Sequence, residues 1–343
     1  MKHARNVIIL ILVGSAVLLF GVNIIDLAPI AASAEAQQVD WLFGLHMNVI
    51  AFLYVLVNGI MLYSVFAFRR KPDDDSEGAY IHGNAKLEIA WTIIPLITVL
   101  FFAFLGSMVL RNVTQAAPNS MDVTVIARQW SWTFEYPEYG IVSTELNLPV
   151  GRQVNFKLRS EDVVHSFWVP EWRMKHDTVP GQDKYIRLTP SEEGTFKVRC
   201  AELCGTAHAY MLADINVMSQ EDFDIWVQKK LGIYEGPEGG EGGGEVDPVA
   251  EGQALAQSAG CLACHSVDGS PLVGPTWKGL FGKTETLADG STVVVDEAYL
   301  IESIIDPSAK IVNGFQDVMP KNYGDIFSDQ EIGYIIEYIK SLQ

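Results

Sequence analysis

The sequence predicts a multidomain membrane protein with a transmembrane helical hairpin, a β-sandwich or barrel, and a separate C-terminal domain. Residues 41–68 and 89–110 contain no Asp, Glu, Lys or Arg. Each run exceeds the roughly 20 residues that cross a bilayer as a helix. Apolar and polar residues alternate in several short segments of 120–219, as they do in half-buried strands. A Cys-X-X-Cys-His motif distinguishes residues 248–343, and two or three domains suit a length of 343 residues.

The N-terminal segment, residues 1–34, has the features of a secretory signal peptide. Lys2 and Arg5 precede an uncharged run at 6–25, and an Ala-Ser-Ala sequence ending at Ala34 supplies the small residues of a cleavage site. We therefore expect this segment to be removed. The apolar run is long for a signal peptide, so retention as an extra membrane helix is the alternative.

The transmembrane hairpin is expected within residues 40–112. Basic residues gather in the loop between its two apolar runs: Arg69, Arg70, Lys71 and Lys86. The positive-inside rule places this loop in the cytoplasm, so everything after Arg111 lies outside. This topology is the same whether or not the N-terminal segment is removed.

The acidic composition limits the classes of partner. The formal net charge of −18 argues against binding of nucleic acid and favours an acidic surface that receives a basic partner. Acidic residues also outnumber basic ones within 248–343, which could steer a cationic partner. The chain has only four cysteines, and the two sites described below use all of them.

The segment 200–211 holds an unusual concentration of potential metal ligands. Thiolate, imidazole and thioether groups together favour copper. Two thiolates can bridge two copper ions, and His165 could supply the second imidazole. The ligands of the segment itself are Cys200, Cys204, His208 and Met211. A zinc site made of the two thiols and the two imidazoles, or a disulfide, is the alternative, although a closed zinc shell has no use for Met211.

The motif Cys261-Leu-Ala-Cys-His265 is the attachment signature of a c-type haem. Cys261 and Cys264 would bond the haem vinyl groups, and His265 would be the proximal iron ligand. A redox dithiol or half of a zinc site is the alternative, but no second Cys or His pair follows. Met319 is the only Met of 248–343, which makes it the candidate sixth ligand. A core Met beside an open iron, or a Lys ligand, remains the alternative.

Two helices and a linker are expected around these sites. Residues 220–247 should contain a helix capped by Ser219, followed by a flexible linker, because 235–247 is rich in Gly and Glu. The last helix should begin at Ser328, where Ser-Asp-Gln-Glu forms a capping box.

Cys-Ala-Glu-Leu-Cys-Gly-X-X-His-X-X-Met, with Asp-Val-Val-His-Ser-Phe-Trp upstream, resembles the dinuclear CuA site of cytochrome c oxidase subunit II. The resemblance extends from about Trp41 to Gln343 when a fused class I cytochrome c is included. It implies a cupredoxin-like Greek-key β-barrel for 120–219 and an all-α cytochrome c domain for 248–343. The CuA ligands that it implies are His165, Cys200, Glu202 through its backbone carbonyl, Cys204, His208 and Met211. It also implies that the Glu202 carboxylate binds a Mg²⁺ shared with subunit I.

The resemblance assigns roles to three further residues. Trp130, the first Trp of Gln-Trp-X-Trp, matches the residue through which electrons enter above the copper. Glu88, in Glu-X-X-Trp-Thr-X-X-Pro, matches the entrance of a proton path into subunit I. The Pro275 carbonyl would accept a hydrogen bond from His265. From the residues alone, Trp130 could equally be a core residue, and Glu88 an interfacial carboxylate favoured by a helix dipole.

Other potential ligands lie near the copper motif: Met174, His176 and Met218. The segment that contains His176 resembles the part of the family that faces subunit I, so we expect an interface residue there. His46 and His82 have no partner at metal-binding spacing, and we expect both to be structural.

The resemblance therefore implies the electron-input subunit of a proton-pumping cytochrome c oxidase, a respiratory translocase of the bacterial cell membrane. The copper and haem domains would lie on the outer side. Expected partners are subunit I, where oxygen is reduced, subunit III, membrane lipid, and a soluble or membrane-bound donor such as cytochrome c. The alternatives are the CuA subunit of a nitric oxide reductase and a membrane-anchored electron shuttle. The motif around Glu88 argues mildly against both.

Overall fold

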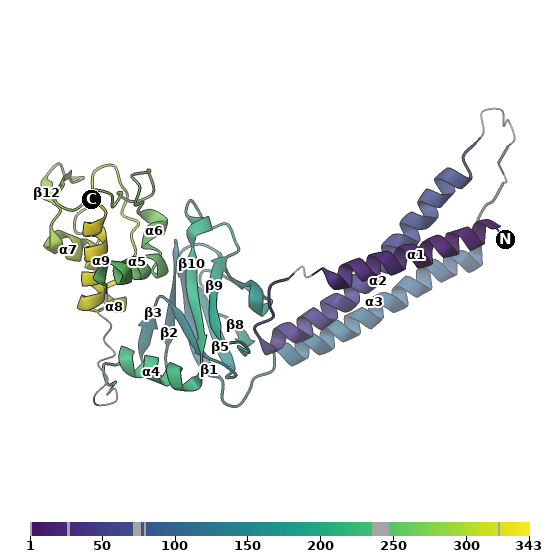
Figure 1. The fold of residues 1–343 in the computed structure, drawn as a ribbon, viewed down its shortest axis with the longest axis horizontal. Coiled ribbons are helices and arrows are strands. Elements are labelled where there is room, and N and C mark those ends of the chain that lie inside the picture. Colours follow the sequence, from purple (N-terminus) through teal and green to yellow (C-terminus); the bar gives the residue numbers. More distant parts are fainter. Residues whose placement is uncertain (1, 26–27, 71–76, 79, 235–246, 322) are drawn as a thin grey trace. The chain divides into compact units, whose positions relative to one another are not determined.

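The structure, a computed structural model, describes residues 2–25, 28–70, 77–78, 80–234, 247–321 and 323–343 (Figure 1). The chain forms two compact units. One comprises residues 1–31 and 35–115, and the other comprises residues 32–34 and 116–343. Most of the predicted linker, 235–246, lies outside the described residues, as does Lys71.

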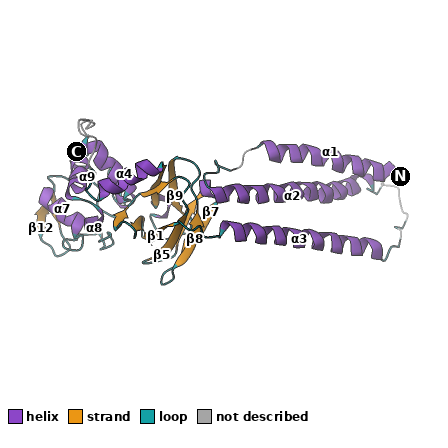
Figure 2. Ribbon diagram, turned by 90° about the horizontal axis from the view of Figure 1, so that it is seen from below, coloured by secondary structure: helices purple, strands orange, loops and turns teal. Residues whose placement is uncertain are grey.

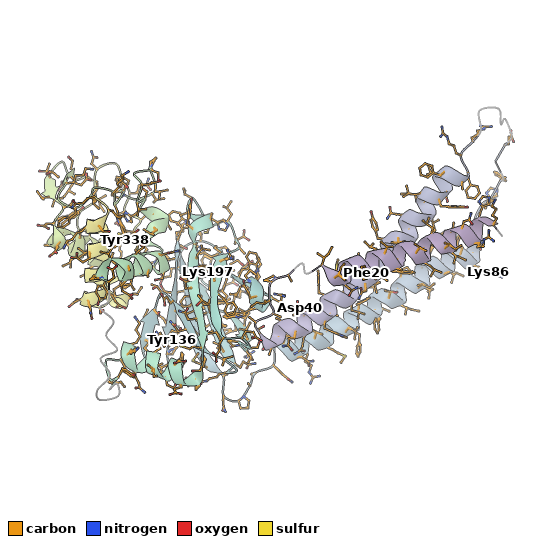
Figure 3. The ribbon with its side chains drawn as sticks, viewed as in Figure 1. Phe20, Asp40, Lys86, Tyr136, Lys197 and Tyr338 are labelled. Carbon is orange, nitrogen blue, oxygen red and sulfur yellow. The ribbon has the colours of Figure 1, made fainter. Side chains whose placement is uncertain are left out.

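The first unit consists of three long helices, α1 (Lys2–Ile24), α2 (Ala34–Ala67) and α3 (Ala85–Val113). All three are long and apolar enough to cross a membrane. Apolar side chains project outward from them, as Phe20 does in Figure 3, and this exposure suits lipid or partner helices as neighbours. The structure therefore has one long apolar helix more than the two of the expected hairpin. The 23 residues of α1 extend about 34 Å at 1.5 Å per residue, enough for a full span.

The boundaries of α2 and α3 follow from local chemistry. α2 starts before the uncharged run, with Glu35 in its first turn, where a carboxylate suits the positive end of the helix dipole. α3 starts after Asn84, whose side-chain oxygen accepts a hydrogen bond from the Leu87 N–H at 3.2 Å. Pro95 lies within α3.

Two five-stranded sheets form the β-domain of the second unit, and Figure 2 colours their strands orange. Their strand orders are β3-β2-β1-β5-β8 and β4-β10-β9-β6-β7. The strands are β1 (Met121–Arg128), β2 (Ser131–Tyr136), β3 (Ile141–Ser143), β4 (Leu146–Pro149), β5 (Val154–Ser160), β6 (His165–Val169), β7 (Met174–Thr178), β8 (Lys184–Leu188), β9 (Gly194–Cys200) and β10 (Leu212–Met218). The cupredoxin-like prediction is confirmed.

Alternation of the side chains creates the core between the sheets. In β5, Val154, Phe156 and Leu158 are fully buried, and their neighbours in the strand are more exposed. β10 repeats this pattern. Pairing of Phe167 with Cys200 brings the start of β6 beside the end of β9, where the predicted copper ligands lie.

The C-terminal part is helical, as expected, with a small β-hairpin that was not predicted. Its elements are α5 (Pro248–Ser258), α6 (Cys261–Cys264), β11 (Thr284–Thr286), β12 (Thr292–Val294), α7 (Glu297–Ile305), α8 (Tyr323–Ile326) and α9 (Asp329–Ser341). The hairpin follows from β-branched residues on both sides of a turn at Gly290, which has φ +86°. Before this domain, α4 (Gln220–Lys230) begins at the predicted cap, Ser219.

The first and last helices of this domain cross closely. A Cβ atom at Gly252 in α5 would lie 1.9 Å from the carbonyl oxygen of Tyr334 in α9, so only glycine fits there. The predicted capping box of α9 is confirmed: Ser328 and Glu331 exchange both hydrogen bonds. The isoleucines of α9 are buried and complete the core: Ile332, Ile335, Ile336 and Ile339.

Candidate copper and haem sites

The structure brings the six predicted copper ligands together at one end of the β-domain. His165 opens β6, and Cys200 closes β9. Glu202 and Cys204 follow in the loop, which continues through a 3-10 turn at His208–Tyr210 to Met211. Two strands thus fix the first imidazole and the first thiol, and the loop carries the remaining ligands.

The two thiols lie at the centre of this group. Their Sγ atoms are 3.7 Å apart, well beyond the roughly 2.05 Å of a disulfide. His165 Nδ1 lies 3.9 Å from Cys200 Sγ, and His208 Nδ1 lies 3.6 Å from Cys204 Sγ. Each thiol therefore has its own imidazole, an arrangement that suits two metal ions bridged by a thiol pair.

Two weaker donors complete the set. The backbone carbonyl of Glu202 lies 3.2 Å from Cys200 Sγ, and Met211 Sδ lies 3.9 Å from Cys204 Sγ. Six donors, including a thioether, exceed the four of a closed tetrahedral zinc site. The soft donor set therefore fits a dinuclear copper centre.

The electrostatics of the two thiols differ. Burial opposes ionisation of Cys200, yet its hydrogen bonds to His165 and to the backbone of Glu202 and Ser166 together outweigh burial and lower the pKa of that thiol. Burial, together with the neighbouring Cys200 charge, raises the pKa of Cys204. Without cations only one of the two would ionise, so metal binding must supply the positive charge that holds both as thiolates.

Asp162 supports the predicted ligand His165 by a contact that sequence reasoning missed. Its Oδ1 lies 2.7 Å from Nε2 of His165, which is fully buried. It also accepts hydrogen bonds from the backbone N–H groups of Gln129 and Val163. Burial would raise the pKa of Asp162, but the hydrogen bonds from His165 and these N–H groups lower it. The carboxylate thereby holds the Nε2 proton and leaves Nδ1 facing the thiols. Its position three residues before His165 was the available signal.

Trp130 and Gln129 support the copper loop from outside. Both donate to the Cys204 carbonyl, Gln129 through Nε2 at 2.6 Å and Trp130 through Nε1 at 3.2 Å. Gly205 permits this close approach. It has φ +122°, and a Cβ there would lie 2.9 Å from Gln129 Nε2 and 3.0 Å from the Trp130 ring.

The competing ligands lie elsewhere. Met174 and Met218 pack against the hydrophobic core of the β-domain. His176, on β7, has its Nδ1 3.0 Å from the Asp177 carbonyl. His46 in α2 bonds the Leu42 carbonyl at 2.7 Å, and His82 makes a ring contact with Tyr80.

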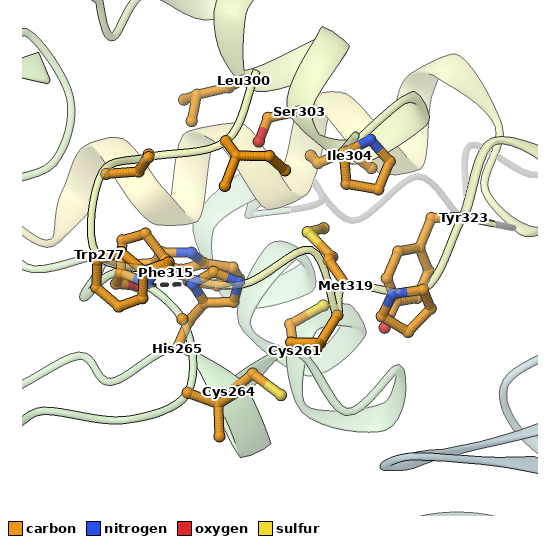
Figure 4. Close-up of a pocket in the computed structure, with 18 of the residues that line it drawn as sticks. Cys261, Cys264, His265, Trp277, Leu300, Ser303, Ile304, Phe315, Met319 and Tyr323 are labelled. Atoms are coloured by element: carbon orange, nitrogen blue, oxygen red, sulfur yellow. Dashed lines mark hydrogen bonds between the residues drawn. The ribbon is translucent and has the colours of Figure 1, made fainter. Parts of the chain in front are cut away.

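The predicted haem residues line one cavity. Its volume is about 1250 Å³ when the space at its open mouth is counted. Cys261, Cys264 and His265 come from α6 and the residue after it, and Met319 comes from the segment before α8 (Figure 4). Apolar side chains form much of the remaining wall, among them Leu300, Ile304, Phe315 and Tyr323. A flat, largely apolar ring system suits this lining.

The histidine is oriented for iron binding. His265 Nδ1–H donates to the Pro275 carbonyl at 2.7 Å, the contact implied by the resemblance, and Nε2 remains as the ligand atom. The ring stacks on Trp277, with 5.2 Å between ring centroids. A Cβ at Gly274 would lie 2.7 Å from His265 Cε1, so glycine is required. Burial lowers the pKa of His265, which keeps the imidazole neutral.

Both haem thiols are free cysteines in an apolar setting. Burial raises the pKa of Cys261 to about 12 and that of Cys264 to about 11. Two protonated thiols beside a neutral imidazole fit the thioether attachment of a c-type haem.

Glu88 acts as a helix cap. Its Oε1 accepts a hydrogen bond from the Asn84 N–H at 3.0 Å, while the Asn84 side chain accepts from Leu87. Asn84 and Glu88 thus cap the first turn of α3, each accepting a hydrogen bond from a backbone N–H. This agrees with the interpretation of Glu88 as a carboxylate at the membrane interface near a helix N-terminus.

Comparison with known proteins assigns the family. The model of the cytochrome c oxidase subunit II transmembrane domain matches residues 20–109. The model of the periplasmic domain matches 140–218, and a cytochrome c model matches 249–343.

Curated relatives cover most of the chain. Cytochrome c oxidase subunit 2 of Alkalihalophilus pseudofirmus is 31% identical over 325 residues, 91% of this chain and 90% of its own. That of Bacillus sp. strain PS3 is 33% identical and covers 80% of this chain and 79% of its own. That of Synechocystis is 32% identical, with 59% and 75% covered.

These matches support several conclusions, together with the cluster of predicted copper ligands and the haem cavity. The chain is anchored in the membrane with its β-domain in the periplasm. It carries domains for CuA copper and for haem, it is an oxidoreductase component, and subunit I of a haem-copper oxidase is its partner. The chain belongs to the cytochrome c oxidase subunit II family, as a member with a C-terminal cytochrome c domain.

Proposed function

We propose that this chain is the electron-input subunit of a proton-pumping oxidase. Electrons pass from a donor through the covalent haem c to the CuA centre and on to subunit I, where oxygen is reduced to water. One observation carries the routing. Trp130 lines the cavity that contains Cys261, Cys264, His265 and Met319, and its indole N–H also donates to the Cys204 carbonyl at 3.2 Å.

Further contacts within the same unit support this connection. A Cβ at Gly260, the residue before Cys261, would lie 3.3 Å from the Trp130 carbonyl oxygen. Lys230 at the end of α4 forms an ion pair of 2.9 Å with Glu331 in α9. The haem attachment segment therefore lies against the turn between β1 and β2, which carries Trp130.

The two groups would each carry one electron at a time. Cys261 and Cys264 would attach the haem covalently, and His265 and Met319 would supply its iron ligands. Cys200 and Cys204 would hold the copper ions through their thiolates, with His165, His208, Met211 and the Glu202 carbonyl as the remaining ligands.

The Glu202 side chain is exposed, so its carboxylate is accessible to a Mg²⁺ shared with subunit I, as we also propose. The acidic surface suits a cationic donor such as cytochrome c. Subunit III and membrane lipid complete the proposed surroundings.

Trp130→Phe tests the routing in the purified complex. We expect it to slow oxidation of the haem by the copper centre by about tenfold, a barrier increase of about 1.4 kcal/mol, with copper and haem contents unchanged. Trp168, an exposed tryptophan on β6 of the same domain, provides a matched control as Trp168→Phe. An unchanged rate of haem oxidation in Trp130→Phe would contradict the route. Separately, nitric oxide turnover with little oxygen uptake by the wild-type complex would contradict the oxidase assignment.

We also propose that Glu88 admits protons to the path in subunit I. Glu88→Ala should then slow steady-state oxygen reduction while electron transfer into the copper centre remains fast. Asn84→Ala removes the side-chain half of the same helix cap and leaves the carboxylate, so it separates capping from proton uptake. Equal turnover in the two variants would assign Glu88 to capping alone.

A further inference from the structure

We propose that residues 1–34 are retained in the mature protein and that α1 is a third transmembrane helix. This reverses the expectation of a removed signal peptide. Two independent sets of contacts carry the proposal. One joins residues 32–34 to the β-domain, and the other joins α1 to α2.

The expected cleavage sequence is built into the folded β-domain. Ala32 and Ser33 are both fully buried. The Ala32 N–H donates to the Glu171 carbonyl at 2.8 Å, and the Ala32 carbonyl accepts from the Ser191 N–H at 3.0 Å. Ser33 forms an antiparallel bridge with Pro190. The segment thus occupies the position of a short added strand.

Further bonds fix the same segment. The Ser33 hydroxyl donates to the Trp172 carbonyl at 3.3 Å, and the Ala34 N–H donates to the Thr189 carbonyl at 3.0 Å. Cleavage after Ala34 would remove this added strand with the leader. The Glu171 carbonyl and the Ser191 N–H would then lose the partners they have in the folded domain. A segment with these bonds behaves as part of the domain.

The second set of contacts docks α1 on α2 along its length. Asn23 Nδ2 donates to Asn48 Oδ1 at 2.8 Å near one end, and His3 Nδ1 lies 2.8 Å from the Tyr63 hydroxyl near the other. Residue numbers fall along α1 as they rise along α2, so the helices are antiparallel neighbours (Figure 2).

Small residues allow the two helices to approach between these bonds. A Cβ at Gly59 would lie 3.7 Å from Leu10, and one at Gly14 would lie 2.9 Å from Val55. Ser15 of α1 and Ala51 of α2 are buried, whereas most side chains of these helices are not. Small residues with polar pairs are the features that associate helices within a bilayer.

The positions of the basic residues agree with retention of residues 1–34. An antiparallel α1 puts Lys2 and Arg5 on the same side of the membrane as Arg69, Arg70 and Lys86. All five basic residues then lie in the cytoplasm, as the positive-inside rule requires for three spans. The end of α1 and residues 32–34 then lie on the periplasmic side, where the β-domain is.

The first test is the N-terminus of the mature subunit. The complex is purified through a C-terminal tag, and the subunit's intact mass and N-terminal sequence are determined. We expect the full chain plus haem, starting at Met1 or Lys2. A start anywhere between residues 25 and 40 would overturn the proposal. Neither outcome depends on electron transfer, so the proposed function stands or fails separately.

A variant gives a second test in the mature complex. Ser33→Arg inserts a charge into the buried segment and should lower the temperature at which the copper absorbance is lost by roughly 5 °C or more. Gln37→Arg is the control, because Gln37 is exposed at the start of α2. Equal thermal stability of the two variants and the wild type would contradict retention. If Ser33→Arg fails to accumulate, the mass and N-terminal sequence of the wild-type subunit decide between retention and removal.

Discussion

The copper loop and the haem cavity each present a pair of cysteines, but the two pairs have opposite surroundings. Cys200 and Cys204 have an imidazole beside each thiol, and one of their pKa values is lowered. Cys261 and Cys264 lie in an apolar cavity that raises both pKa values. The first pair is arranged to become thiolates around cations, and the second to remain thiols until they form thioether bonds. Neighbouring groups, more than spacing, distinguish the two kinds of site.

Cys204→Ser should have the largest effect on the copper half of this comparison. A hydroxyl cannot replace a bridging thiolate, so the dinuclear copper spectrum should disappear and electron transfer to subunit I should fall more than about 100-fold, a barrier increase of about 2.7 kcal/mol. Copper content, spectrum and oxygen uptake measure this, and the haem spectrum is the internal control. Survival of the copper spectrum would disprove the bridging role.

Met319→Ala should have the largest effect on the haem half. Cys261 and Cys264 still attach the haem, but loss of the thioether should remove the Met–iron absorption band. The haem potential should fall by roughly 0.1 V or more, within the roughly 0.8 V range that axial ligands set. Val318→Ala is the control, since Val318 is the exposed neighbour. An unchanged band would show that another group binds the iron.

Asp162→Asn should have an intermediate effect and sharpens the role of neighbouring groups. Without the carboxylate, His165 loses the partner that orients Nδ1, so copper affinity should fall by roughly 10- to 100-fold. Copper retention during dialysis against a chelator measures this. Glu161→Gln, at the half-exposed neighbouring residue, should retain copper as the wild type does. Loss of copper from both variants alike would assign the effect to the loop as a whole.

Glu331→Gln should have the smallest effect. Burial would raise the pKa of Glu331, but hydrogen bonds from the Ser328 backbone and Lys230 lower it. A lowered folded-state pKa stabilises the fold above the ordinary value of 4.5, and this stabilisation is lost as the pH falls through the folded-state pKa. We expect a loss of about 1 kcal/mol or less at neutral pH.

Thermal unfolding of the haem domain at several pH values checks this prediction. The difference between Glu331→Gln and the wild type should shrink as the pH falls below 4.5. Glu337→Gln, on the same helix, is the matched control. A difference that is independent of pH would point to lost packing and not to the charge.

From the sequence, the members of each candidate site could be predicted more readily than the contacts that support them. All six copper ligands meet because five of them lie in one loop, where spacing almost dictates proximity, and only His165 depends on strand pairing. The haem motif is equally local. Met319 was predicted because it is the only Met of the domain, and it lines the same cavity as that motif.

What sequence reasoning missed depends on contacts between distant segments. The hydrogen bond of Asp162 to His165 requires the geometry at the start of β6. Burial of Ala32 and Ser33 requires the chain near Trp172 and Pro190. The glycine at position 252 has no special sequence context, and only the crossing of α5 with α9 explains it.

That crossing has a consequence for how such chains arise. Because α5 and α9 are the first and last helices of the cytochrome c domain and touch at Gly252, the domain is closed by its own ends. Modules of this kind tolerate transfer between proteins, since a single junction suffices to join them to a host. The C-terminal domain therefore has the features of a module that can be joined to another protein. A gene fusion at one point before Asp247 would be enough to add such a domain to an oxidase subunit.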